Sequence, residues 1–477
     1  MVQKNNYPDW VIKQKVKGTA IYKRNNNFYL YKVTSKYNSV TKKAKRITEE
    51  FLGKITQDGL VKPKHKRNIE PQNVAVKDYG GSNLLGFLNK QLHQSLQKIF
   101  PNCFQEIIVM AMLRLIYVCP LKNIRTLYDG SYLSTQYPDL KLADKNITDL
   151  IRTIGTDRSN IVEFFKEFKL GDQSILFDLT AILNQSKQIE INAKGYKNNF
   201  KKAINLMYSF NISQQMPAYY RILPGNIREI KAFKLSIHEM GLQNVIVIAD
   251  KGFYSKENIK LLDEEKLQYL IPLKRNSKLI LKKSLNDLDK TFFLFNDKPV
   301  WYYTYIKDNK KIILYLNERL RAEEQEDYLI RIANKNEGYT LETFVAKKPY
   351  FGLFALIVGN NSEITAENAY ISYKSRMHIE QLFDVFKNIL HADTSYMRGS
   401  FEMEAWMFIN HIATMYYYSI FNSLKTYKLL NKYSPKDILL HLNQIKQLKI
   451  NNQWVRSEIT SKNEKLIKAL GFSDAFI

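Results

Sequence analysis

Apolar residues recur along the chain with two different periods. Across residues 82–169 they recur every three or four positions, as in LLGFLNKQLHQSLQKIF and FQEIIVMAMLRLIYV, which predicts packed helices. From residue 174 onward short apolar runs take over and predict strands: SILFDLTAI, KKAINLMYSF, MPAYYRILPG, NVIVIAD and LQYLIPLK. Helical patterns at 226–241 and 256–266 separate the last three of these strands.

Three strands followed by helix, strand, helix and strand is the element order of an RNase H-like α/β core, which is the fold class that we expect. Residues 275–365 interrupt this order with strand-like runs and one polar helical stretch, NERLRAEEQEDYLIRIANKNEG. Helical patterns return at 369–390 and 405–425. The pattern therefore predicts a core that is split by a β-rich insertion.

The first 80 residues differ from the rest in pattern. NNFYLYKVTSKYN and KKAKRITEEFLGKI predict two strands around a turn at Ser39 to Thr41, and VKPKHKRNIEP predicts an extended basic linker. The chain then divides into six expected regions: a basic N-terminal domain (1–80), a helical connecting region (81–170), the first part of the core (171–274), the β-rich insertion (275–365), the second part of the core (366–430) and a basic C-terminal region (431–477).

The charge balance points to a polyanionic partner. Lys and Arg number 72 against 46 Asp and Glu, a net charge of +26. Residues 1–80 hold 18 of these bases and 6 of these acids, so their net charge is 18 − 6 = +12. Nucleic acid is the partner that such an excess favours, and we expect the N-terminal domain to contact DNA. A solvated charged surface is the alternative for this domain.

A membrane is the other polyanionic surface to consider. The chain opens without an apolar signal segment, and FGLFALIVG is far shorter than the ~20 residues of a spanning helix. Cys103 and Cys119 form no CxxC pair, so we expect buried thiols rather than a zinc site or a disulfide. These features predict a soluble, cytoplasmic protein with no membrane partner.

Three carboxylates fall where different elements would meet. Asp178 interrupts an apolar run, where a carboxylate is costly to bury unless it is paired or bound to a cation. Asp250 closes the strand NVIVIAD, and Glu380 lies on a later helix. In an RNase H-like core these positions converge on one edge of the sheet. Oxygen-only ligands suit Mg²⁺ or Mn²⁺. A structural acid held by an arginine or by backbone amides is the alternative for Asp178.

Polar side chains also gather on one face of the helix predicted at 369–390. At about 100° per residue, Tyr373, Arg376, Glu380 and Lys387 fall on a stripe roughly 60° wide. Phenol, guanidinium, carboxylate and ammonium groups in one stripe suggest a surface that meets phosphates and a metal ion. The alternative is a chain of ordinary helix ion pairs at i+3 and i+4 spacing.

The same four residues match the signature Y-(2)-R-(3)-E-(6)-K. ILFDLT and IADKGFYS precede that signature in the order found in bacterial insertion-sequence DDE transposases of the "insertion sequence four" superfamily. The chain resembles these enzymes over its whole length, from the basic N-terminal domain to the split core. The resemblance implies an RNase H-like DDE transposase.

The resemblance also implies a role for each matching residue. The catalytic and metal-binding triad would be Asp178, Asp250 and Glu380. The phosphates of transposon-end DNA would be held by Tyr373, Arg376 and Lys387. Trp301, in the insertion, would stack on a flipped base, although strand aromatics more often belong to a core. The expected cofactor is Mg²⁺ or Mn²⁺, with two ions per site.

The expected partners are transposon-end DNA and target DNA, bound by a homodimer in a synaptic complex inside a bacterial cell, at the nucleoid. The expected reaction is metal-dependent cleavage at the terminal inverted repeats of an insertion sequence, followed by strand transfer. Two alternatives remain open: an RNase H-like DNA nuclease without strand transfer, and a transposase-derived protein that only binds DNA.

Overall fold

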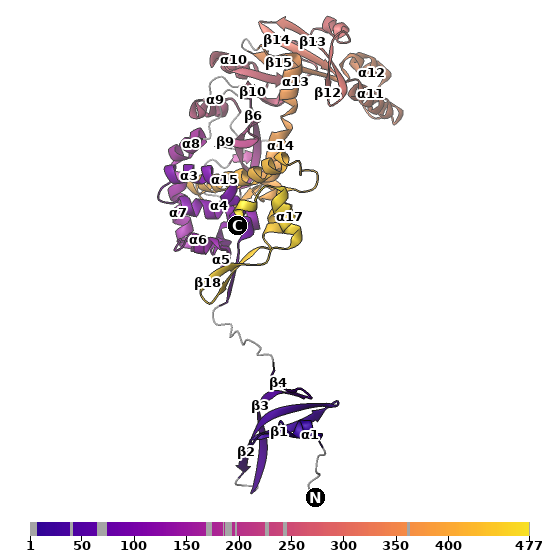
Figure 1. The fold of residues 1–477 in the computed structure, drawn as a ribbon. Helices are drawn as coiled ribbons and strands as arrows, with labels where there is room; N and C mark the ends of the chain where they lie inside the picture. Colours follow the sequence, from indigo (N-terminus) through magenta and orange to yellow (C-terminus); the bar gives the residue numbers. More distant parts are fainter. Residues whose placement is uncertain are drawn as a thin grey trace. The chain divides into compact units, whose positions relative to one another are not determined.

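The computed structural model describes residues 7–38, 42–63, 74–167, 174–184, 186, 193–195, 198–224, 229–241, 246–359 and 363–476 (Figure 1). The chain forms two compact units, Met1–Val74 and Ala75–Ile477.

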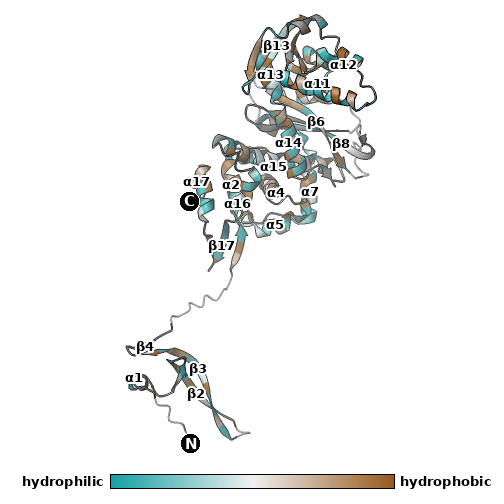
Figure 2. Cartoon of the chain, turned by 90° about the vertical axis from the view of Figure 1, so that its right-hand side faces the viewer, coloured by the Kyte–Doolittle hydropathy of each residue, from teal (hydrophilic) through white to brown (hydrophobic). Residues whose placement is uncertain are grey.

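The first unit is a small antiparallel sheet closed by one short helix. Its strands pair in the order β1-β2-β3-β4, and Figure 2 shows β2 and β3 as a long two-stranded ribbon. Val11, Phe28, Leu30 and Ile55 form its own apolar core. The elements are α1 (Asp9–Ile12), β1 (Thr19–Arg24), β2 (Asn27–Asn38), β3 (Lys43–Thr56) and β4 (Gly59–Val61).

Both strands predicted in this unit are confirmed. The turn predicted at Ser39 to Thr41 lies outside the described residues, as does most of the predicted linker.

The second unit begins with a short strand and a set of helices. Their bounds are β5 (Ala75–Asp78), α2 (Gly80–Leu88), α3 (Lys90–Ile99), α4 (Phe104–Tyr117), α5 (Ile124–Gly130), α6 (Leu133–Gln136), α7 (Asp144–Thr156) and α8 (Arg158–Glu167). The two cysteines lie beside α4, and both are free thiols. Cys119 is buried, and burial raises the pKa of the half-buried Cys103 to about 11.

Within the described ranges no single helix is long and apolar enough to cross a membrane. Two consecutive helical segments, Phe104–Tyr117 and Leu121–Gly130, reach the required length and apolar composition only when they are taken together, and the chain bends by 102° between them.

A large mixed sheet is the centre of the second unit. Its strands follow the order β12-β13-β14-β15-β11-β10-β6-β8-β7, with β9 also paired to β8 and β16 to β6. Their bounds are β6 (Ser174–Asn184), β7 (Ala193–Gly195), β8 (Asn198–Asn211), β9 (Met216–Pro224), β10 (Ile246–Ile248), β11 (Gln268–Pro272), β12 (Phe292–Phe295), β13 (Lys298–Lys307), β14 (Lys310–Leu316), β15 (Leu353–Gly359) and β16 (Thr394–Ser395).

The middle of this sheet is parallel, and its flanks are antiparallel. β10 runs parallel to β6 and to β11, while β8 and β9 on one side and β15, β14, β13 and β12 on the other are antiparallel. Parallel strands are covered on both faces, which explains the continuous apolar runs of β6, β10 and β11. The prediction of a mixed α/β fold around a large sheet is confirmed, and the strands of the predicted insertion extend this same sheet.

Helices and a second small sheet complete this unit. The helices are α9 (Glu229–Met240), α10 (Lys256–Glu264), α11 (Glu318–Ala333), α12 (Leu341–Lys347), α13 (Ala366–Lys374), α14 (Met377–Asp384), α15 (Ser400–Thr426), α16 (Pro435–Leu442) and α17 (Ser461–Ala469). β17 (Lys446–Ile450) pairs with β18 (Gln453–Arg456) and with β5. α9 packs on β9, α10 on β11, and α14 on both β6 and β8.

One buried arginine ties the helical region to the segment that follows α14. The guanidinium of Arg114 on α4 donates to the carbonyl of Cys119 at 2.5 Å and to that of Leu390 at 2.6 Å. It also donates to Asn410 Oδ1, on the largely buried helix α15, at 2.8 Å. Arg114 is only 4% exposed, and burial lowers its pKa. Three acceptors from separate segments therefore depend on this one cation.

Arg114→Met should lower the free energy of unfolding by about 3 kcal/mol, because three buried acceptors lose a charged donor. Chemical denaturation followed by circular dichroism measures this change. Arg125→Met is the matched control, since the exposed Arg125–Asp129 pair should contribute less than about 1 kcal/mol. Equal losses in the two variants would contradict the role given to Arg114.

Candidate active site

Two adjacent parallel strands carry the two aspartates to the same level of the sheet. Asp178 lies in the middle of β6, opposite Tyr208 of β8. On its other side, Ile248 of β10 pairs with Leu176. Asp250 follows Ile248 by two residues, as Asp178 follows Leu176, so the parallel register brings the two carboxylates side by side. The Oδ1 atom of Asp250 also accepts from the backbone N–H of Lys251 at 2.7 Å, which caps a short 3-10 turn.

The glutamate comes from helix α14, which lies against β6 and β8. Ile379 and Leu382 are fully buried on the face of α14 that meets the core. His378 stacks on Phe210 of β8, with ring centres 5.9 Å apart, and burial lowers its pKa. His378 therefore anchors the helix, which leaves Glu380 on the exposed side with 58% of its side chain accessible.

The three carboxylates converge on one guanidinium, that of Arg376. Its Nη2 atom lies 3.2 Å from Asp178 Oδ2 and 3.8 Å from Asp250 Oδ2. Its Nη1 atom lies 2.9 Å from Glu380 Oε1. The structure thus brings together the three acids singled out from the sequence, with a cation of the chain between them.

The electrostatics of the cluster favour a positive charge at its centre. Arg376 is only 18% exposed, and its burial opposes the charged form. The neighbouring carboxylates, Asp178 foremost, outweigh that cost and raise the pKa of Arg376. The Nε atom of Arg376 is nevertheless buried without a hydrogen-bond partner among the described residues. The guanidinium balances the acids while one of its own donors stays unsatisfied.

Tyr373 lies at the edge of this cluster, in the last turn of α13. Its ring packs on Phe354 of β15, with centres 4.7 Å apart. Burial is the main cause that raises the pKa of Tyr373 to about 12; Arg376 opposes this rise, and the nearby carboxylates add to it. The phenol therefore keeps its proton at neutral pH and is able to donate a hydrogen bond.

The prediction of one continuous helix over 369–390 is wrong. α13 ends at Lys374, α14 begins at Met377, and Val385–Ile389 form a π-helical turn. The N–H of Arg376 bonds to the carbonyl of Tyr373, three residues back at 3.0 Å, which tightens the turn between the two helices. Because of that tighter turn, the side chains of Tyr373 and Arg376 are not related by the rotation around the helix axis that a regular α-helix would give.

Lys387 lies within the π-helical turn and is half-buried. Trp301 lies on β13, half-buried, with its ring 5.1 Å from that of Phe292. β13 and β6 are five strand spacings apart in the sheet, which amounts to roughly 24 Å at about 4.8 Å per spacing. The structure therefore does not place Trp301 beside the three acids.

A family comparison decides what this cluster belongs to. The family model described as "Transposase DDE domain" matches residues 170–416, which is more than half of the 477-residue chain. The chain belongs to the transposase DDE domain family. The match spans all three acids and Arg376.

Two other comparisons add little to the description of this DDE transposase. No curated protein matches the chain. Among solved structures, it is similar to the piggyBac transposase in its synaptic complex with hairpin DNA, with a TM-score of 0.36 and 11% sequence identity. That alignment covers 76% of this chain and 70% of the other, and a likeness of this degree carries no argument about the fold.

Within the described ranges of the transposase, no group of three or more Asp, Glu, His or Cys side chains is arranged to hold a metal ion. The donor chemistry nevertheless fits a hard divalent cation, because three carboxylates already surround one positive group. Arg376 occupies the place between them. A metal ion therefore fits this set of residues only when the guanidinium moves aside.

Sequence reasoning missed the contacts of Arg376 with Asp178 and Asp250. The sequence predicted that Arg376 faces DNA phosphates, and the i, i+4 spacing of Arg376 and Glu380 was the available signal for an ion pair.

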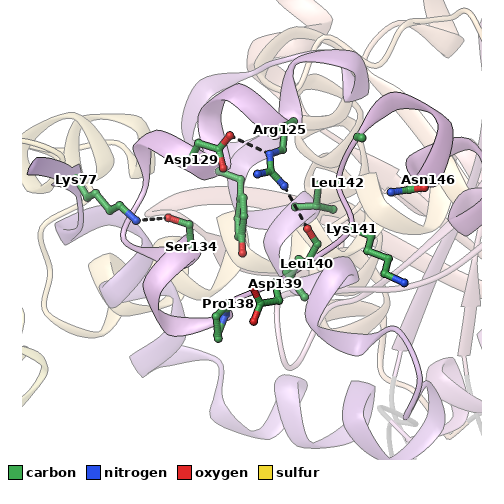
Figure 3. Close-up of a pocket in the computed structure, with 12 residues that line it drawn as sticks. Lys77, Arg125, Asp129, Ser134, Pro138, Asp139, Leu140, Lys141, Leu142 and Asn146 are labelled. Atoms are coloured by element: carbon green, nitrogen blue, oxygen red, sulfur yellow. Dashed lines mark hydrogen bonds and ion pairs between the residues drawn. The ribbon is translucent and has the colours of Figure 1, made fainter.

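A separate pocket of about 560 Å³ lies in the helical region of the transposase and is lined by none of the three acids (Figure 3). Within it Arg125 pairs with Asp129, and Lys77 donates to Ser134 Oγ at 2.5 Å. Arg125 also donates to the carbonyl of Leu140 at 3.4 Å.

Arg376→Gln should destabilise the transposase by about 1–2 kcal/mol at pH 7, because three partly exposed carboxylates lose their shared counter-charge. Chemical denaturation at pH 7 measures this loss. Arg319→Gln, which breaks an exposed helix pair with Glu323, is the control and should cost at most about 0.5 kcal/mol. A cost for Arg376→Gln no larger than that of Arg319→Gln would contradict the role of Arg376 as the shared counter-charge.

Proposed function

We propose that this chain is a DNA transposase that binds the terminal inverted repeats of an insertion sequence, cleaves the DNA there and joins the freed ends to target DNA. One observation carries the proposal: three carboxylates from β6, the end of β10 and α14 meet at a single cation within the transposase DDE domain. Membership of this family implies phosphodiester hydrolysis and transesterification.

The core of the proposed enzyme is RNase H-like. The strand order β9-β8-β6-β10-β11, with β8 antiparallel and β10 and β11 parallel to β6, supports this assignment. In such a core the middle of the first strand and the end of the fourth face one edge of the sheet. Asp178 and Asp250 occupy those two positions.

The proposed cofactor is Mg²⁺ or Mn²⁺, with two ions per site held by Asp178, Asp250 and Glu380. When bound, such ions activate an attacking oxygen and stabilise a leaving one in phosphodiester chemistry. The first attacking oxygen would come from water, which frees a 3′-OH at the transposon end. The second would be that 3′-OH, which attacks a phosphodiester of the target DNA.

The side chains around the acids would position the DNA. Arg376, released from the carboxylates, would turn its guanidinium to a phosphate, which suits two parallel N–H donors. Its unsatisfied Nε atom favours such an exchange over a permanent ion-pair role. Tyr373 would donate its phenolic proton to a second phosphate, since its pKa keeps that proton in place. Lys387 would contribute a further cation from the π-helical turn.

The remaining features of the proposal follow the resemblance to the "insertion sequence four" superfamily. They are a bacterial source, a nucleoid location when bound to DNA and a homodimer that pairs both transposon ends. The N-terminal domain, predicted as residues 1–80, would bind the ends. Trp301 stays a prediction for base stacking, and its strand position puts any such contact away from the carboxylates.

Glu380→Gln should abolish cleavage while preserving DNA binding. The substitution removes a metal ligand and a negative charge that would face DNA, so cleavage should fall by at least about 10³-fold, with affinity unchanged or higher. Single-turnover cleavage and gel-shift titration, on duplexes carrying the inverted repeats that flank the gene, measure the two effects.

The matched control is Glu367→Gln, which makes the same charge change on an exposed residue of α13. It should cleave normally. Normal cleavage by Glu380→Gln would refute the proposed mechanism. Cleavage of ends without joining to a supplied target duplex would instead refute the strand-transfer step.

A further inference from the structure

The ribbon formed by β2 and β3 extends beyond the sheet of the N-terminal unit. β1 pairs with β2 only as far as Lys32, and β4 pairs with β3 only from Lys54 onward. The segments Thr34–Asn38 and Lys43–Ile47 therefore pair only with each other. At about 3.3 Å per residue this arm is roughly 17 Å long. Figure 2 shows it continuing past the rest of the unit.

The arm has no core of its own. Lys43–Glu50 are all exposed on β3, and Thr34 to Tyr37 are exposed on β2. Tyr37 is 64% exposed and Ile47 is 40% exposed, on opposite faces of the ribbon. A lone two-stranded ribbon is only marginally stable in water. The arm therefore adds little to the fold of the unit, and its surface is free to meet a partner.

The charge of the arm has one sign. Residues 34–47 hold five bases and no acid: Lys36, Lys42, Lys43, Lys45 and Arg46. The register sets Lys36 directly opposite Lys45, with Lys43 two positions further along on the same face. Like charges facing each other across strands destabilise a ribbon. A bound polyanion would explain why Lys36 faces Lys45, because its negative charges would offset the repulsion between the two ammonium groups.

The base of the arm is different. Lys32 pairs there with Glu49, with Nζ and Oε2 3.7 Å apart. Among the described residues, no carboxylate makes an ion pair with the bases of the arm itself. The charge is thus balanced where the ribbon joins the body of the unit and left uncompensated along the arm.

The dimensions of the arm fit one groove of a nucleic-acid duplex. Two strands with side chains on both faces make a ribbon about 10 Å thick, and the major groove of B-DNA is about 12 Å wide and 8.5 Å deep. That groove admits a two-stranded β-ribbon, and its phosphate walls lie within reach of lysine side chains. The major groove of A-form RNA is too narrow for such a ribbon.

We propose that the arm, Thr34–Asn38 with Lys43–Ile47, enters the major groove of duplex DNA and that Lys36 and Lys45 hold its phosphate walls. This inference deepens the proposed function and rests on DNA being the substrate. The N-terminal unit would then bind DNA through this one ribbon, and not only through the net positive charge of the whole unit.

The test compares two double variants of the full chain. Lys36→Gln/Lys45→Gln removes two charges from the arm, and Lys15→Gln/Lys17→Gln removes two exposed charges from elsewhere in the same unit. The probes are a 40-base-pair DNA duplex of mixed sequence and an RNA duplex of the same sequence. On DNA, the arm variant should bind about tenfold more weakly in 0.1 M salt, with a salt slope lower by about 1.8. The control should lose less than about threefold.

On the RNA duplex the arm variant and the control should behave alike, because the ribbon does not enter that groove. Methylation by dimethyl sulfate gives a second readout, since guanine N7 lies on the floor of the DNA major groove. The wild-type chain should protect N7 atoms, and the arm variant should lose that protection.

Equal losses on DNA in the two double variants, or unchanged N7 protection in the arm variant, would overturn the inference. Either result leaves the proposed function intact as long as the wild-type chain cleaves DNA and Glu380→Gln does not. If instead Glu380→Gln cleaves normally, the proposed function fails while loss of N7 protection in the arm variant still reports on the ribbon.

Discussion

The attraction between one guanidinium and three carboxylates is the interaction on which the site depends. Asp178, Asp250 and Glu380 come from three separate elements, and their mutual repulsion would drive those elements apart without a cation between them. The parallel register of β6 and β10 and the docking of α14 through His378 bring them together. Arg376 is the described group that balances them.

Much of this arrangement was predictable because the physical signals are local. An acid inside the apolar run of β6 stands out, since burying a lone carboxylate is unfavourable. The neighbouring strands were also predictable, because buried parallel strands appear in a sequence as continuous apolar runs. The pairing of Asp178 with Arg376 in particular was not predicted, because it depends on how α14 docks against β6.

Other features depend on tertiary contacts that periodicity does not carry. The tight turn before α14 and the π-helical turn after it break the regular spacing of 100° per residue. The prediction that Tyr373, Arg376, Glu380 and Lys387 share one face assumed a regular helix, and periodicity alone did not reveal these two turns. The distance of Trp301 from the acids follows from the pairing of β15 with β11. No spacing along the chain reveals which strands of an insertion join the sheet.

We propose that Arg376 stands where a divalent cation binds. Crystals soaked in Mn²⁺ and measured at the manganese absorption edge test this directly. We expect an anomalous peak between Asp178, Asp250 and Glu380, with the guanidinium of Arg376 displaced from them. Arg376 still bridging the three carboxylates, with no peak there at Mn²⁺ concentrations that support cleavage, would contradict it.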